Sequence, residues 1–160
     1  MSTASTTSGA TAEFFRKLIL AFGALIVVAT ATELTLERHW GTTVRLIPWF
    51  ALVLVGFALL LVAIRPGPSA LRVAQVLAVA VIAASAIGVW KHIEANYDAG
   101  PLDFRYSASW GTMSETTRWW KAATKSVGPS PILAPGVLAQ ASLCVLAATF
   151  RHPARRARNP

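Results

Sequence analysis

Residues 46–64 read LIPWFALVLVGFALLLVAI, nineteen uncharged residues between Arg45 and Arg65. An α-helix rises about 1.5 Å per residue, so about 20 apolar residues are needed to cross a hydrocarbon core of about 30 Å. The stretch therefore predicts a membrane-spanning helix over residues 46–64. Pro48 is expected in its first turn, where a missing N–H group costs little.

The composition of the 160-residue chain also indicates a membrane protein. Hydrophobic residues make up 54% of it and charged residues only 14%, whereas an average soluble domain carries about 25% charged residues. The formal net charge is +8, but the basic residues stand between apolar segments rather than along one stripe. We therefore read them as topology signals and expect no nucleic-acid partner.

Three further apolar segments have the length of membrane spans. The first covers residues 14–36, and another covers residues 72–93, with eighteen uncharged residues between Arg72 and Lys91. The last covers residues 131–150, where Ser130 and Pro131 are suited to the N-cap and the first helical position. Pro135 inside this segment predicts a kink or a late start.

These segments predict an all-α fold, namely a polytopic bundle of four transmembrane helices with a structured outer loop between the third and the fourth. The short RPGPSALR connection makes the second and third helices antiparallel neighbours. The predicted organisation is a disordered tail over residues 1–12, a membrane domain over 13–152 with its outer loop at 94–130, and a basic cytoplasmic tail over 153–160.

The distribution of basic residues predicts the orientation. Lys and Arg flank the start of the first span, the turn between the second and third spans, and the end of the fourth. By the positive-inside rule both termini lie in the cytoplasm of a multi-pass protein of the inner (plasma) membrane. A secretory signal with a cleavage site at Ala29-Thr30-Ala31 is the alternative, and cleavage would leave three spans. We favour retention because the apolar stretch continues through Leu34 and Leu36.

The outer loop is the part of the chain with the most varied polar residues. Ser114 followed by Glu115 predicts the start of a short helix that runs to about Lys125. This helix either lies in the membrane interface with its tryptophans among the headgroups or forms a cap packed on the bundle. The interfacial candidates are Trp110, Trp119 and Trp120.

Polar residues close to hydrocarbon are expensive, and those of this chain gather near the outer ends of the first and third spans. The candidate ligand-binding residues are Glu33, Glu37, His39, His92 and Asn96. Together they could bind a metal, relay a proton, contact a quinone or hold a small solute. The alternative is a set of interhelical hydrogen bonds with no ligand.

No cofactor is predicted from this cluster. Metal-binding spacings such as H-x-x-x-H or E-x-x-H are absent from the sequence. A metal, or a haem held by His39 and His92, is kept as an alternative.

The third span carries small residues at a regular spacing. Ala80, Ala84 and Gly88 stand at i, i+4 and i+8, which is the small-xxx-small pattern of closely packed membrane helices. We therefore predict a helix-packing ridge along these three residues. The alternative is that alanine serves only as general filler in this segment.

Three short motifs recur together in a known group. They are H-x-x-x-N at His92 and Asn96, P-x-L-A-P-G at Pro131–Gly136, and R-H-P at Arg151–Pro153. Over about residues 30–153 the chain resembles a group of uncharacterised bacterial four-helix integral membrane proteins. The resemblance implies the four-span fold and a retained first helix, and it implies no activity.

Three functions are compatible with these observations. The leading expectation is a non-enzymatic accessory or assembly component of a membrane complex, whose partners are the lipid bilayer and another membrane protein or a second copy. The alternative is a ligand-handling membrane protein that uses the Glu/His/Asn cluster. An enzyme that acts on lipid, with His92 as general base, is the third, and no motif recommends it.

Overall fold

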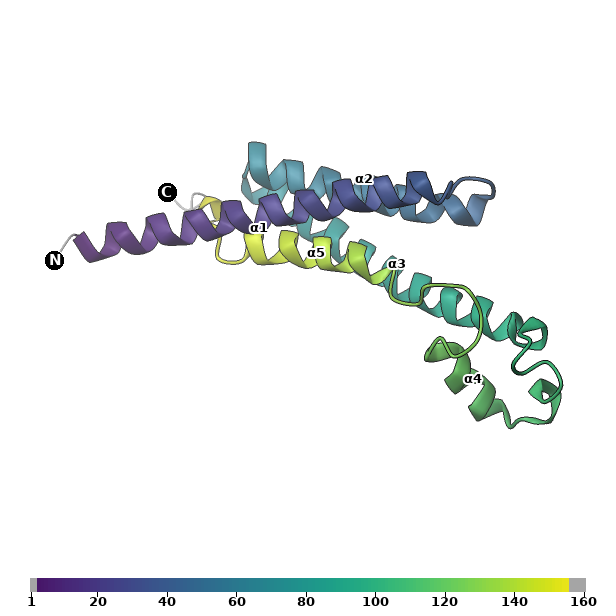
Figure 1. The fold of residues 1–160 in the computed structure, drawn as a ribbon. Coiled ribbons are helices and arrows are strands. Elements are labelled where there is room, and N and C mark those ends of the chain that lie inside the picture. The colour runs from purple at the N-terminus through teal and green to yellow at the C-terminus, as the bar shows by residue number, and fades with distance from the viewer. Residues whose placement is uncertain (1–2, 156–160) are drawn as a thin grey trace. The chain divides into compact units, whose positions relative to one another are not determined.

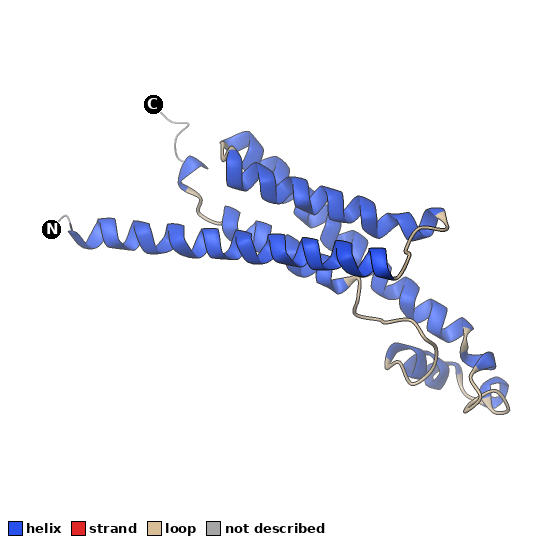
Figure 2. Ribbon diagram, turned by 45° about the horizontal axis from the view of Figure 1, so that its top comes forward, coloured by secondary structure: helices blue, strands red, loops and turns tan. Residues whose placement is uncertain are grey.

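The computed structural model describes residues 3–155, including the side chains of residues 9–155. No strand occurs in this part of the chain, and the prediction of an all-α fold is confirmed (Figures 1 and 2). The α-helices are α1 (Thr3–Leu36), α2 (Thr43–Ile64), α3 (Pro68–Asp98), α4 (Glu115–Ala123) and α5 (Gly136–Thr149), and single 3₁₀ turns occupy Gly100–Leu102, Trp110–Thr112 and Pro153–Arg155.

Three of these helices are long and apolar enough to cross a membrane, namely α1 from Gly9 onward, α2 and α3. The fourth predicted span is shorter than expected, because α5 has 14 residues and measures about 21 Å. Residues 131–135 form turns in which Ala134 N–H donates to the Pro131 carbonyl and Gly136 N–H to that of Leu133. Pro135 thus produces the late start, and Ser130 is not the N-cap.

The N-terminal boundary also differs from the prediction. Helix α1 begins at Thr3, so residues 3–12 are helical where the sequence predicts a disordered tail, and residues 1–2 lie outside the described range. Extending an existing helix avoids the cost of nucleation, and Ala10 and Ala12 are the best helix formers. The apolar segment that follows supplies the helix from which this extension grows.

The second helix begins earlier than predicted. The Thr42 hydroxyl accepts a hydrogen bond from Arg45 N–H at 3.4 Å, which caps α2 at Thr43. Pro48 therefore falls in the second turn rather than the first, and the Val44 carbonyl lacks its usual helical donor. The turn before α3 is also shorter than predicted, because Pro68 is already helical.

The described residues divide into two compact units. Of the described residues, unit 1 comprises 3–83 and 137–155 and unit 2 comprises 84–136, so α3 contributes its first half to one and its second half to the other. In unit 1, α1 and α2 run antiparallel (Figure 1). Its buried apolar core draws on four helices and consists of Ile26, Ala51, Val55, Ala58, Leu59, Val62, Leu71, Ala74, Ala78, Val81, Leu138, Ala141, Val145 and Ala148.

One glycine permits the close approach of three helices in unit 1. A Cβ on Gly23 of α1 would lie 3.0 Å from Leu59 Cδ2 of α2 and 3.1 Å from Cys144 Cβ of α5. Both contacts are tighter than ordinary van der Waals packing. Small residues at such positions allow membrane helices to approach one another closely.

Unit 2 has its own small core around α4. Trp110, Ala122 and Val127 are buried, and partly buried aromatic side chains pack on them. The Ser114 hydroxyl accepts a hydrogen bond from Thr117 N–H at 3.3 Å, so the predicted N-cap of this helix is confirmed. The segment between α3 and α5 is therefore folded around a core of its own.

Candidate functional site

Asn96 is the fully buried polar residue at the centre of unit 2, with no exposed surface. Its Oδ1 accepts a hydrogen bond from the backbone N–H of Ser130 at 2.8 Å, and its Nδ2 donates to the Ser130 carbonyl at 3.0 Å. The same Nδ2 lies 3.5 Å from the Ala122 carbonyl near the end of α4. One amide thus joins α3, α4 and the segment that leads to α5.

His92 holds the next residue of that segment. Its Nδ1 donates to the carbonyl of Pro131 at 2.8 Å, and it stands one turn before Asn96 on the same face of α3. We name His92, Asn96, Ser130 and Pro131 the His92–Asn96 clamp. The clamp supplies partners to backbone groups at a point where the chain is not helical and cannot satisfy them itself.

Gly128 packs against the clamp, and it is not among the predicted site residues. Its φ of +79° is a conformation that favours glycine, and a Cβ there would collide with Asn96, lying only 2.6 Å from the Asn96 Cα. The signal available in the sequence was the Gly128-Pro129 pair, which is typical of a turn. That pair predicts a turn but does not reveal which residue packs against it.

Asp103 and Arg105 support the same region from the loop after α3. The Arg105 guanidinium donates to both carboxylate oxygens, with Nε 2.9 Å from Oδ1 and Nη2 2.7 Å from Oδ2. This hydrogen bonding lowers the pKa of Asp103 from its ordinary 3.8 to about 2, and a backbone hydrogen bond from Gly128 acts in the same direction. The loop is thus joined to the glycine beneath Asn96.

The acidic half of the predicted site lies in unit 1. Glu33 is in the last turn of α1 and Glu37 follows the helix, and both are exposed. The backbone N–H of His39 donates to the Leu34 carbonyl at 2.8 Å, and the His39 carbonyl accepts from Trp49 Nε1 at 2.9 Å. His92 and Asn96 belong to unit 2, where a common partner segment brings them together.

The three residues of the predicted packing ridge have different surroundings. Ala80 is exposed, Ala84 is half-buried, and Gly88 meets Pro135, whose Cβ would lie 2.8 Å from a Cβ on the glycine. Gly88 is therefore the ridge residue whose small size permits a close contact. The face of α3 that is buried in unit 1 is a different one, formed by Leu71, Ala74, Ala78 and Val81.

The three tryptophans predicted at the interface also differ in burial. Trp110 is buried in the core of unit 2. Trp119 stacks on Trp90 at 5.2 Å and on Tyr97 at 4.3 Å between ring centroids. Trp120 is 70% exposed, although it is the next residue along α4. Trp110 and Trp119 therefore stabilise the fold of unit 2, and Trp120 is available for contacts outside it.

A second polar cluster lies at the C-terminal end of α5, within unit 1. Arg16 of α1 donates through Nε to the Ala148 carbonyl at 3.0 Å and through Nη1 to Glu13 at 2.7 Å. The carbonyl is one of the last four of its helix, which have no intrahelical donor, and the guanidinium complements the helix dipole. Arg16 therefore caps α5 from a different helix.

His152 is buried beside this cap, where its Nδ1 accepts a hydrogen bond from Ala154 N–H at 3.2 Å. Burial lowers the pKa of His152 below its ordinary 6.5, and the nearby charge of Arg16 lowers it further. The predicted site did not include this histidine, although the R-H-P motif contains it.

Within residues 3–155 no three His, Cys, Asp or Glu side chains are grouped closely enough to hold a metal ion. No protein-family model, curated protein or solved structure matches the chain.

Proposed function

We propose that the protein is a non-enzymatic accessory or assembly component of a membrane complex. The observation that carries this proposal is the His92–Asn96 clamp, because it commits the polar atoms of Asn96 and the Nδ1 of His92 to backbone groups of the same chain. A ligand-handling site would instead direct these groups toward a cavity. Because these side chains instead hold the backbone of the outer segment in place, we favour a protein whose outer segment presents a rigid surface to a partner.

The proposed topology has four spans across a bacterial inner membrane, with both termini on its cytoplasmic side. The turns of residues 131–135 and helix α5 together form the fourth span. Non-helical backbone is tolerated at membrane depth where the protein satisfies its polar groups, and the clamp supplies such partners to Ser130 and Pro131. This accounts for a fourth helix of only 14 residues.

Within the outer loop of unit 2 (residues 94–130), three large apolar side chains are exposed and do not join its core. They are Leu102, Phe104 and Trp120, with exposures of 86%, 89% and 70%. Exposed aromatic and aliphatic side chains on a folded segment are characteristic of protein interaction sites, and aromatic residues supply much of the binding energy there. We infer that these residues contact the partner protein.

The test is native mass spectrometry of the protein extracted from its own membrane in a mild detergent. We expect a heavier assembly that contains other polypeptides, and we expect Phe104→Ser and Trp120→Ser to release them. Trp40→Ser is the matched control, since Trp40 is 47% exposed but lies between α1 and α2.

An isolated chain in every sample would refute the proposal. A reproducible small extra mass that is lost in His92→Ala would instead support the ligand-handling alternative.

A further inference from the structure

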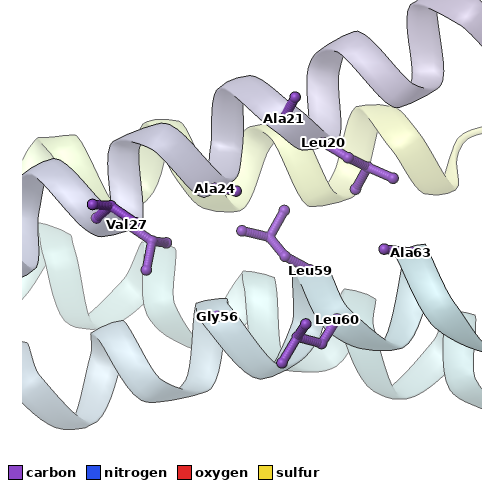
Figure 3. Close-up of a pocket in the computed structure, with 9 residues that line it drawn as sticks. Leu20, Ala21, Ala24, Val27, Gly56, Leu59, Leu60 and Ala63 are labelled. Carbon is purple, nitrogen blue, oxygen red and sulfur yellow. The ribbon is translucent and has the colours of Figure 1, made fainter.

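Helices α1 and α2 line an apolar groove of about 420 Å³ on the surface of unit 1 (Figure 3). The volume lies in the range of about 300–1,000 Å³ that is typical of small-molecule sites. Every lining residue is apolar: Leu20, Ala21, Ala24, Val27, Val28, Gly56, Leu59, Leu60 and Ala63.

The groove exists because small residues stand on both of its helices. Ala21 and Ala24 lie on α1, with Gly56 and Ala63 on α2, while Leu59 points between the two helices (Figure 3). No side chain of α1 or α2 fills the groove over these small residues. A flexible apolar chain of narrow cross-section fits such a groove.

One end of the groove is basic. Leu20 and Ala63 lie at the same end (Figure 3), and Lys17 precedes Ala21 by one turn on the same face of α1. Arg65 caps α2 two residues after Ala63. Both basic residues are exposed, and the Lys17 ammonium has only a loose pair with Glu13 at 3.9 Å. This end can therefore receive an anionic group.

We propose that the groove binds an anionic phospholipid, with an acyl chain along the apolar lining and the phosphate beside Lys17 and Arg65. Basic residues next to a membrane-spanning helix attract anionic headgroups, which supplies the charge complementarity. The almost wholly apolar surface of the groove suits hydrocarbon, whereas associated membrane helices commonly also form polar contacts. The proposal is independent of the accessory function proposed above.

The test measures retained lipid by native mass spectrometry after addition of phosphatidylglycerol or, as a neutral reference, phosphatidylcholine. We expect one phosphatidylglycerol adduct on the wild-type protein and its loss in Ala24→Leu, which fills the groove. Ala29→Leu is the matched control, because Ala29 is an exposed residue of α1 that does not line the groove. This control should retain the adduct.

The charge requirement is tested separately. Lys17→Gln and Arg65→Gln should each weaken phosphatidylglycerol binding about fivefold, which corresponds to about 1 kcal/mol per basic residue. Binding of phosphatidylcholine should be little affected by either change.

Unchanged phosphatidylglycerol retention by Ala24→Leu would overturn the proposal, provided that circular dichroism shows a helix content equal to that of Ala29→Leu. Loss of a second polypeptide, rather than of lipid, in Ala24→Leu would also overturn it, because the groove would then hold a helix.

Discussion

Asn96 illustrates at the residue scale how one side chain can determine the order of a whole segment. Its amide matches the N–H and C=O of Ser130 with distances of 2.8 and 3.0 Å, so neither partner is left without a hydrogen bond. Removing one member of such a buried pair costs more than the pair contributes, because the remaining groups stay desolvated.

We predict that Asn96→Ala lowers the stability of unit 2 by about 2 kcal/mol, since two backbone groups lose their partner. Thermal unfolding followed by tryptophan fluorescence measures this, because four of the six tryptophans lie in unit 2. Thr116→Ala, an exposed change on α4, is the control and should leave the midpoint unchanged. Equal thermal midpoints for both variants would show that the clamp does not stabilise unit 2.

Gly128→Ala should destabilise the same unit by about 1–3 kcal/mol, because it combines a positive φ with a collision against Asn96. Gly111→Ala is the matched control, since a Cβ there meets nothing within 4 Å. The same fluorescence measurement applies. If the two alanine variants melt together, the close approach of Gly128 to Asn96 does not occur in solution.

Spacing alone predicted that His92 and Asn96 share a face near the end of the third span. Their partners could not be predicted, because they are backbone groups, which nearly every residue carries whatever its type. The two residues were therefore grouped with the polar residues at the end of the first span, whereas the clamp pairs them with Ser130 and Pro131. Gly128 was missed for a related reason: the sequence does not show which residue a turn packs against.

At the scale of elements, the C-terminal end of α5 depends on residues outside that helix. Arg16 of α1 caps the Ala148 carbonyl, and Gln75 of α3 donates to the Thr149 hydroxyl at 3.0 Å. That hydroxyl in turn donates to the Leu146 carbonyl at 2.9 Å. A short helix without strong caps of its own is thus fixed at one end by two neighbouring helices.

We predict that acidification loosens this end. The pKa of His152 is lowered in the folded protein, so between that value and its ordinary 6.5 the unfolded chain binds the proton more readily. Stability should therefore decrease as the pH falls through about 6.5, and thermal midpoints from about pH 8 to pH 5.5 measure it.

His152→Asn keeps an acceptor for Ala154 N–H but does not titrate, so it should show a shallower pH dependence than the wild type. Identical pH profiles would assign the effect to other histidines.

Element boundaries were predictable where charge or proline marks them. Arg65 and the following Pro66 end α2 at Ile64 as predicted, and Pro135 delays α5. The extension of α1 to Thr3 was not predictable in the same way, because residues 3–12 have no apolar periodicity. Their helix continues from the span that follows rather than from a pattern of their own.

At the scale of the whole molecule, the number of spans determines whether the two termini share a side of the membrane. Four spans place them together, and three place them apart. Three helices are long and apolar enough to be such spans, and the distribution of Lys and Arg predicts the orientation.

We predict that a membrane-impermeant maleimide labels Gly9→Cys and Arg155→Cys from the cytoplasmic side and Ser107→Cys from the opposite side. Cys144, the one natural cysteine, is first replaced by alanine. Labelling of Gly9→Cys and Arg155→Cys from different sides would establish three spans. Loss of the Gly9→Cys signal from the mature protein would instead indicate cleavage of the first helix.

The clamp also has a consequence for how the protein is made. Asn96 precedes Ser130 by 34 residues, and Arg16 precedes Ala148 by 132. Chains grow from the N-terminus, so α4 and its tryptophans are synthesised before the backbone groups that pair with Asn96. Until Ser130 is added, the Asn96 amide lacks the backbone partner that it has in the folded chain. A chain that ends after residue 126 would retain α4 and the stacking of Trp119 on Trp90 and Tyr97, but it would lack Ser130 and Pro131, the partners of Asn96 and His92.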